Sequence, residues 1–508
     1  LLKHKKVIPK DDRLIEKITK KHLVDEYQED QRKIRLKPIK DDCKAFDALF
    51  GDESDFVDGS NVTSNFRYFR DRILNENIDI DDLYDAISRL QTIDIFLEKD
   101  DDPQLIFESL NSTGLELEEG DKIRNFILMG LSSELQEKYI MGGTINYQEE
   151  DNFIGSDLLF PIYESITKSC SILFNANYSD SRTLSGMNTI TTLLMSLSSS
   201  GDKILLHMPD AGAHASMPYV SQRLGLEIIE MPYDYENYNF DIKKINEIIE
   251  NENIRIVLFS PSDILFSPNF SDLIIKKDTY VIYDATQTLG LIAGKVLPNP
   301  LEEYENIILV GGTHKTMPGP TKGLILIQNM KIAELIDTKI NPTYLRNTQM
   351  HHVLSLLFTL KELEYFGNEY ANQIVRNSQI LGEELEKYGF KVIKKNNIYS
   401  ETHQIFLEME HSKLKEFYNN CIYYNITINE KFKKIFNYSG VRIGVQEISR
   451  YNWNKNELQD VALLLSKIRD NNNETEIFEL INKLNTNKIL HFTFSKDILR
   501  KFDSILNL

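Results

Sequence analysis

Short apolar runs separated by polar stretches recur between residues 200 and 330. They read DKILLHMP, LEIIEMP, IRIVLFSP, TYVIYDA, NIILVGG and KGLILIQN. Continuous apolar runs of this length, bounded by Pro, Gly and Asp, predict strands that are buried on both faces. Helical or loop segments separate several of the runs, and this alternation predicts an α/β domain with a mostly parallel sheet. Ligands of such sheets bind beyond the carboxyl ends of the strands.

Helical spacing of apolar positions dominates the regions on either side. Before residue 140 it is seen in DDRLIEKITKKHLVDEY, SNVTSNFRYFRDRIL and DDLYDAISRLQTIDIFLE. Beyond residue 345 we expect a long helix over 353–389, strands at HQIFLEME and YNITIN, and a helix at NKNELQDVALLLSKIRD. The chain is therefore expected to have four parts: a helical region at 1–140, a large α/β domain at 141–345, a small α+β domain at 346–470, and a tail at 471–508.

Composition narrows the class of protein. The chain has 508 residues, too many for one compact core, and a net charge of −19, which argues against broad nucleic-acid or anionic-membrane binding. Its three cysteines form no CxxC pair, and an odd number fits a reducing compartment. No signal peptide and no bilayer-length apolar run are visible. We predict a cytoplasmic protein with no metal site and no membrane segment.

Three polar features lie where a ligand of this sheet would bind. Lys315 lies in GGTHKTMPGP after one apolar run, Asp284 ends another, and Ser185-Gly186 opens the helix MNTITTLLMSL. Each has an ordinary interpretation, as a solvated loop lysine, a turn-forming aspartate and a helix N-cap. Together they are what pyridoxal phosphate requires: a phosphate site at a helix N-terminus, a carboxylate for the pyridine nitrogen, and a lysine for the Schiff base.

The local strings around these residues resemble those of serine hydroxymethyltransferase, from about residue 147 to 470. VGGTHKTMPGPTKG resembles the family's lysine motif TTTHKTLxGPRGG, which implies that Lys315 forms the Schiff base with His314 beside it. DATQTLGLIAGK resembles DMAHxxGLxAxG, which makes Asp284 the partner of the pyridine nitrogen and puts Gln287 at the family's histidine. The resemblance implies the pyridoxal-phosphate fold type I, similar to aspartate aminotransferase.

Further motifs extend the resemblance around the expected cofactor. AGAH resembles HGGH and implies that His214 stacks on the cofactor ring; RTLSGMNT resembles HSGSQAN and assigns the phosphate to Ser185 and Gly186. LFSPS resembles FSAYS and implies Ser260 beside the phenolic oxygen. SGVRIGVQEISR resembles SGIRVGTPAITRRG and makes Arg442 the ligand of the substrate carboxylate, a bond that suits a guanidinium fork. Taken alone, Arg442 would be interpreted as a surface arginine.

An upstream segment implies a second subunit. TINYQEEDNFIGSD resembles the family's TNKYAEGYPGxRYYGG, which places Tyr147 on the family's substrate-binding tyrosine and Glu149 on its acid/base glutamate. Both residues normally reach the site of a neighbouring subunit, so the resemblance implies a homodimer. YQEED is equally compatible with a solvated acidic loop.

The implied activity is the interconversion of serine and glycine, with one-carbon transfer to tetrahydrofolate. Met187 replaces a phosphate-binding serine, Gln287 replaces the histidine, and Lys431 stands where the family's asparagine contacts folate. The cofactor residues thus match better than the folate residues. A folate-independent aldolase or transaldolase acting on β-hydroxy amino acids is the nearest alternative, and a degenerate, non-catalytic fold is another.

The first 140 residues point to a different family. KIRLKPIKDDCKAFDALFG and DDPQLIFESLNSTGLELEEGDKIRNFILMGL resemble the ParB-like nuclease domain of GmrSD-type restriction proteins. The catalytic DGQQR-type motif of that family is missing, so we expect a helical fragment without nuclease chemistry, which a gene fusion would explain. A restriction-type defence protein with an accessory pyridoxal-phosphate fold is the third candidate function. The first forty residues, which are rich in Lys and Arg, are interpreted as a solvated helix face.

Overall fold

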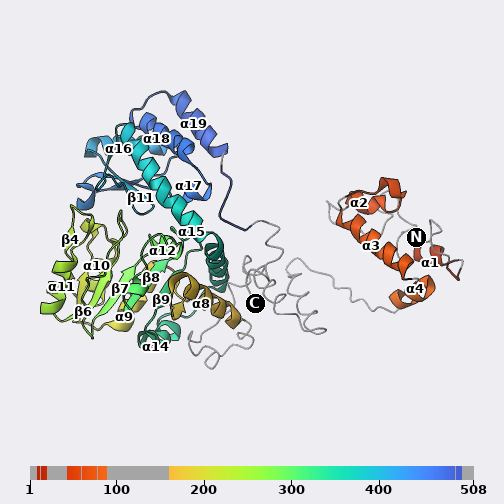
Figure 1. Cartoon of the computed structure of the whole chain (residues 1–508), viewed down its shortest axis with the longest axis horizontal. Coiled ribbons are helices and arrows are strands. Elements are labelled where there is room, and N and C mark those ends of the chain that lie inside the picture. Colours follow the sequence, from red (N-terminus) through yellow and green to blue (C-terminus); the bar gives the residue numbers. More distant parts are fainter. Residues whose placement is uncertain are drawn as a thin grey trace. The chain divides into compact units, whose positions relative to one another are not determined.

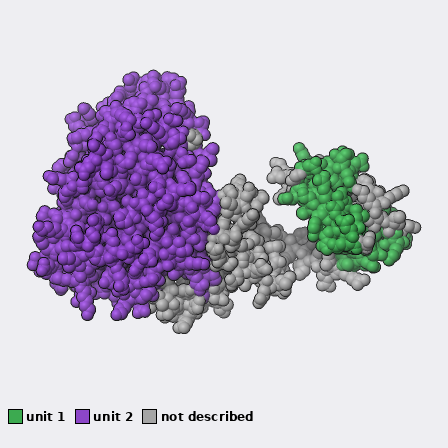
Figure 2. Space-filling view, viewed as in Figure 1, with its two compact units in different colours: residues 1–114 green, residues 115–508 purple. Residues whose placement is uncertain are grey.

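The chain forms two compact units, residues 1–114 and residues 115–508 (Figure 2). The computed structural model describes residues 9–11, 13–19, 43–58, 60–76, 78–88, 159–486 and 488–494.

The described part of the first unit is helical, as expected. In α3, the hydroxyl of Ser60 caps the helix by accepting a hydrogen bond from the backbone N–H of Val62 at 3.1 Å. Helix α2 packs against α3. The helices are α1 (Leu14–Ile18), α2 (Cys43–Ala48), α3 (Asn61–Asn75) and α4 (Ile80–Ser88).

A seven-stranded sheet, in the order β1-β9-β8-β7-β6-β2-β3, forms the centre of the second unit. Strands β3, β2, β6, β7 and β8 run parallel, and β9 runs antiparallel to both of its neighbours, β8 and the edge strand β1. All six strands expected between residues 200 and 330 are confirmed. The strands are β1 (Tyr178–Asp180), β2 (Lys203–Leu206), β3 (Glu227–Glu230), β6 (Ile254–Phe259), β7 (Tyr280–Asp284), β8 (Ile307–Gly312) and β9 (Gly323–Ile327).

The apolar runs are continuous because helices cover both faces of this sheet. Alternate residues of one strand enter different cores: Ile204 and Leu206 pack in one, and Leu205 packs in the other. Figure 1 shows α8 lying beside the long α15 against the sheet. The core with Leu205 includes residues of α8 (Phe160–Phe174), α11 (Ile242–Asn251), α12 (Leu289–Ala293) and α15 (Met350–Lys387). The other core includes residues of α9 (Gly186–Leu197), α10 (Met217–Arg223) and α14 (Met330–Thr338).

A smaller antiparallel sheet follows α15, in the order β10-β11-β13-β12. The strand expected over residues 424–429 is wrong in position. Asn425 has a left-handed φ of 58°, which ends the preceding helix and breaks the extended run, and pairing starts only at Asn429. The elements are β10 (Lys391–Val392), β11 (Gln404–Glu408), α16 (His411–Tyr423), β12 (Asn429–Lys431), β13 (Gly440–Gly444), α17 (Gln446–Arg450), α18 (Lys455–Arg469) and α19 (Glu474–Thr486).

Helix α19, in the expected tail, packs against α18. The fold is therefore an α/β large part with a small α+β part, as predicted, while the four boundaries stay a prediction. Across the described ranges, no helix combines the length and apolarity that crossing a bilayer requires. The remaining elements are the hairpin of β4 (Tyr233–Asp234) and β5 (Asn239–Phe240) and the short helix α13 (Pro300–Glu303).

Candidate functional site

The carboxyl ends of β7 and β8 are joined by one threonine. Thr286 donates from its backbone N–H and from its hydroxyl to Oδ1 of Asp284, at 2.9 and 2.5 Å, and its hydroxyl accepts from the N–H of Gly312 at 2.8 Å. Asp284 is buried, and no donor among the described residues bonds its second oxygen. Burial raises the pKa of Asp284, and the bonds from Thr286 oppose that shift. The buried carboxylate is thus suited to a cationic N–H partner.

Helix α9 begins against this pair of strand ends. The hydroxyl of Ser185 accepts from the N–H of Asn188 at 3.2 Å, as an N-cap does. A Cβ on Gly186 would lie 2.9 Å from Oγ1 of Thr286 and 3.1 Å from N of Gly312, so only glycine fits there without a shift. The free N–H groups of the first turn of α9 therefore lie next to the ends of β7 and β8, where they can bind an anion.

Lys315 and His314 follow the end of β8 directly. The amine of Lys315 is half-buried and makes no bond within the described part of the chain. Burial lowers the pKa of Lys315, and the charge of Arg442 lowers it further. The pKa of His314 is lowered by burial and by Lys315. A lysine of this kind has a larger neutral, nucleophilic fraction than a solvated one.

Ser260 and His214 lie on the loops that follow β6 and β2. The backbone N–H of His214 donates to the carbonyl of Ser260 at 3.1 Å, which fixes the two loops together. Ser260 is fully buried, yet its hydroxyl has no hydrogen-bond partner among the described residues. The imidazole of His214 is exposed, and its charge is close enough to Asp284 to lower the pKa of that carboxyl. An orphaned buried hydroxyl of this kind points to a group that completes the site.

Gln287 is buried and faces the small sheet. Its Oε1 accepts from Nε2 of Gln404, at the start of β11, at 3.0 Å. His403, the neighbour of Gln404, is also buried and its Nδ1 has no partner among the described residues. Burial lowers the pKa of His403 to about 3, and the charges of Arg442 and Lys315 act in the same direction. The imidazole of His403 is therefore neutral at physiological pH.

Arg442 lies on β13 and bonds the loop after β6. Its NH1 donates to the carbonyl of Ser262 and to Oδ1 of Asp263, both at 2.8 Å. With the Asn429 amide oriented to satisfy both neighbours, its oxygen accepts from NH2 of Arg442 at 2.9 Å. The carboxylate of Asp263 also pairs with Lys431 at 3.1 Å and with Lys433 at 2.6 Å. We name these four charged side chains, Asp263, Lys431, Lys433 and Arg442, the basic cluster.

The structure thus brings most of the predicted residues to one edge of the large sheet. Those from the ends of parallel strands and the start of α9 meet as expected. Tyr147 and Glu149 lie outside the described residues. Sequence reasoning missed Thr286, Asp263, Lys433 and His403. The signal for Asp263 was available: it is an aspartate in the short polar segment that follows the apolar run IRIVLFSP, at the same edge of the sheet as Asp284.

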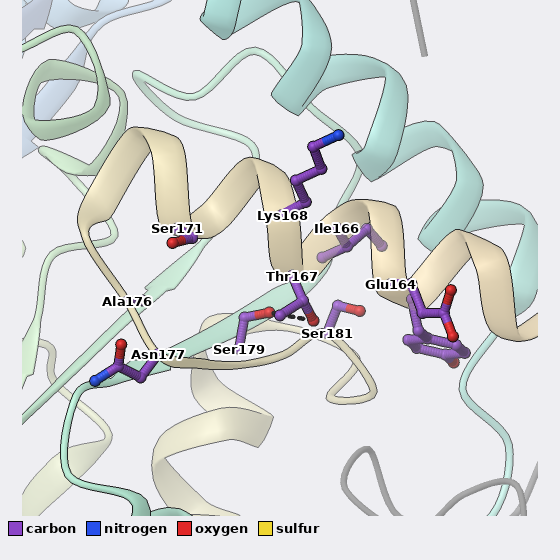
Figure 3. A pocket seen from close by; sticks show the side chains of 10 residues that line it. Glu164, Ile166, Thr167, Lys168, Ser171, Ala176, Asn177, Ser179 and Ser181 are labelled. Carbon is purple, nitrogen blue, oxygen red and sulfur yellow. Dashed lines mark hydrogen bonds between the residues drawn. The ribbon is translucent and has the colours of Figure 1, made fainter. Parts of the chain in front are cut away.

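A separate pocket lies between α8 and β1. It has a volume of about 500 Å³ and is lined by α8 and β1. Figure 3 shows Ser179 of β1 bonded to Thr167 of α8, at 3.2 Å, with Lys168 and Ser171 along the same helix. None of the strand-end residues described above lines it. This pocket is therefore separate from the candidate site.

Comparison with known proteins gives the family. Residues 121–465 match the family model for serine hydroxymethyltransferase. The chain belongs to the serine hydroxymethyltransferase family. The match begins within the region 1–140 that was expected to be a separate fragment.

Individual relatives agree. The serine hydroxymethyltransferase of Thermococcus onnurineus is 34% identical over 349 residues, covering 66% of this chain and 78% of that protein. The enzyme of Saccharolobus islandicus is 33% identical over 344 residues, covering 65% of this chain and 76% of that protein. The enzyme of Sulfolobus acidocaldarius is 31% identical over 357 residues, covering 68% of this chain and 82% of that protein. In fold, the chain is similar to L-threonine transaldolase from Pseudomonas fluorescens, with a TM-score of 0.68, 20% identity, and coverage of 79% of this chain and 97% of that one.

This member of the serine hydroxymethyltransferase family is a pyridoxal-phosphate-dependent enzyme, and its site fits the cofactor. The first turn of α9 is open to a phosphate because Gly186 keeps it close to the strand ends. The buried carboxylate of Asp284 could accept from a ring N–H, and the orphaned hydroxyl of Ser260 could donate to a ring oxygen. Lys315 supplies an amine without a partner in the described part. The fold class and the cofactor predicted from the sequence are thereby confirmed.

Proposed function

We propose that the chain interconverts serine and glycine, transferring the one-carbon unit to tetrahydrofolate, and that the strand-end residues are its cofactor and substrate site. The observation that carries the proposal is the link through Thr286, which joins the buried carboxylate of Asp284 to the strand that leads to Lys315. A buried carboxylate and a half-buried amine on neighbouring strand ends have no evident structural task together.

Pyridoxal phosphate, when bound, supplies a ring that withdraws electrons from the Cα of an amino acid. Around it, the N–H groups of Ser185 and Gly186 would hold the phosphate, and the carboxylate of Asp284 would accept a hydrogen bond from the ring nitrogen and keep that nitrogen protonated. Lys315 supplies the amine that holds the cofactor. The lowered pKa of Lys315 leaves more of that amine neutral at physiological pH.

The remaining residues orient the amino acid. Arg442 is held by Ser262 and Asp263, so its guanidinium is fixed before a substrate carboxylate arrives. His214 would cover one face of the cofactor ring, and Ser260 would donate to the phenolic oxygen of that ring. Glu149 of a neighbouring subunit would move the proton of the substrate hydroxyl, with Tyr147 beside it, which is why we propose a homodimer.

The test uses uptake of the cofactor. Purified protein incubated with pyridoxal phosphate should turn yellow, and borohydride should fix the cofactor on Lys315, as read by peptide mass spectrometry. Lys315→Ala should lose the fixed cofactor, while the exposed Lys331→Ala should retain it. Serine should then yield glycine only when tetrahydrofolate is present. A colourless protein, or borohydride labelling at another lysine, would contradict the proposal.

A second candidate is folate-independent aldol cleavage or transaldol transfer. Lys431, at the family's folate-binding asparagine, has its amine on the buried Asp263. Glycine release from threonine without tetrahydrofolate, at a rate equal to or above that from serine with it, would favour this candidate.

The origin of residues 1–140 in a GmrSD-type restriction protein also stays a proposal, supported by the sequence strings and the helical described part. Its test is the intact mass of the protein from the native source. Two separate chains would show that residues 1–140 and the rest are not made as one protein. The cytoplasmic location likewise stays a prediction.

A further inference from the structure

The basic cluster has more positive charge than its own acid can balance. Lys431, Lys433 and Arg442 all lie within 3.1 Å of oxygens of one carboxylate, that of Asp263. The side chain of Asp263 is fully buried, while the three cations keep 12%, 19% and 17% of their side-chain surface exposed. Pairing one buried carboxylate needs one cation, so the cluster holds two positive charges beyond the one that Asp263 balances.

The three cations are not held in the same way. Lys433 also donates to the carbonyl of Ala213 at 3.1 Å, and Arg442 also donates to the carbonyl of Ser262 at 2.8 Å. Lys431 has only Asp263 as a bonded partner among the described residues. Two cations are thus fixed by the backbone and by Asp263, and the third is on a flexible stem that can turn to a ligand.

The cluster borders the proposed reaction site. Ala213 precedes His214, Ser262 follows Ser260 by two residues, and the charge of Arg442 acts on Lys315. Of the anionic groups that the cofactor and the amino-acid backbone bring, the phosphate is assigned to α9 and the α-carboxylate to Arg442. One cation near the substrate is then left without an anion.

Resting on the proposed function, we propose that Lys431 binds a second anionic group, a carboxylate or a phosphate, on the side chain of the amino-acid substrate. The substrate class is then β-hydroxy amino acids with an acidic side chain, of which 3-hydroxyaspartate is the simplest. In its cleavage the Cα–Cβ bond breaks and the hydroxyl gives up its proton. Cβ becomes the aldehyde carbon of glyoxylate, and Cα takes a proton to give glycine, so no oxidant is needed.

The first test measures binding to the cofactor-loaded protein by calorimetry. L-Aspartate and O-phospho-L-serine are compared with L-alanine, which lacks the second anion. We expect at least one of the acidic ligands to bind tenfold or more tightly than alanine, and the tighter one identifies the carboxylate or the phosphate. Lys431→Met should remove the difference, and Lys431→Arg should keep it. Lys434→Met is the matched control, because Lys434 is exposed on the same segment with its amine over the ring of Tyr235.

The second test measures turnover. The ratio of kcat/KM for threo-3-hydroxyaspartate to that for threonine should exceed ten and should fall about tenfold in Lys431→Met, mainly through KM. Equal binding of aspartate, phosphoserine and alanine by the unmodified enzyme overturns the inference, even where serine turnover upholds the proposed function. Failure to take up pyridoxal phosphate would defeat the proposed function instead. In that case the binding comparison is made with the cofactor-free protein. Tighter binding of aspartate than of alanine, lost in Lys431→Met, would support the inference, and equal binding would overturn it.

Discussion

Replacing Asp263 by asparagine removes the one carboxylate that the three cations of the basic cluster share. The change keeps the size of the side chain, so the loss is electrostatic. Breaking a buried ion pair by removing one partner costs about 3–5 kcal/mol. Because the cations keep 12–19% of their side-chain surface and can recruit water, we expect the lower end, about 3 kcal/mol.

The direction of the pKa shift of Asp263 determines how its contribution to stability changes with pH. Burial alone would raise the pKa of Asp263, but Lys433, Arg442 and Lys431 hold it below the ordinary value of 3.8. A carboxyl with a lowered folded-state pKa stabilises the protein above the pKa of the unfolded chain, and that contribution is lost as the pH falls through the folded-state value. The difference in stability between the protein and Asp263→Asn should therefore be full at pH 7 and shrink below pH 4.

The stability difference between the protein and Asp263→Asn is measured by thermal unfolding, followed by fluorescence. For a unit of this size, about 3 kcal/mol corresponds to a fall in Tm of roughly 4 °C. Glu252→Gln is the control: Glu252 pairs with Lys203 at 2.8 Å, but on the surface, where such a pair contributes about 0–1 kcal/mol. Sulfate should restore stability to Asp263→Asn more than to Glu252→Gln. If both variants melted alike at pH 7, Asp263 would not be the electrostatic anchor of the cluster.

Two further predictions concern the cofactor half, and a third concerns the buried amine of Lys322, which donates to the carbonyls of Arg182 and Thr348. Gly186→Ala should weaken pyridoxal-phosphate binding at least tenfold in an absorbance titration, because its Cβ would press on Thr286, whereas Gly367→Ala, with only ordinary contacts, should bind normally. Asp284→Asn should lose about tenfold in the same affinity without losing stability in the absence of cofactor, since burial already raises the pKa of that carboxyl; a parallel loss of both would point to a structural role. Burial lowers the pKa of Lys322 to about 7, so between pH 7 and 10.5 the unfolded chain binds more protons than the folded protein does. The free energy of unfolding, measured with urea, should therefore rise across that range relative to that of Lys322→Met. A difference between the two proteins that does not change with pH would contradict the lowered pKa.

The sequence predicted more of the cofactor half of the site than of the half around Arg442. The strands, the start of α9 and the positions of Asp284 and Lys315 follow from apolar runs and strand-end polar residues, because parallel strands all end at one edge of the sheet. The partners of Arg442 could not be found in this way. Arg442 and Asp263 are far apart in the chain and meet only when the small sheet packs on the large one, and nothing in either local pattern encodes that contact.

The departures from the family follow the same division. In the cofactor half the backbone itself makes the close approaches: a Cβ on Gly186 meets Thr286, and one on Gly290 would lie 2.3 Å from the carbonyl oxygen of Thr316. Substitution there would disturb the fold as well as the cofactor. In the other half the charged groups are side chains: Asp263 lies buried in the loop after β6, and Lys431 is the last residue of β12. Such side chains can change together, an added acid balancing an added base, without altering the backbone, and the substrate can therefore diverge while the cofactor site is kept.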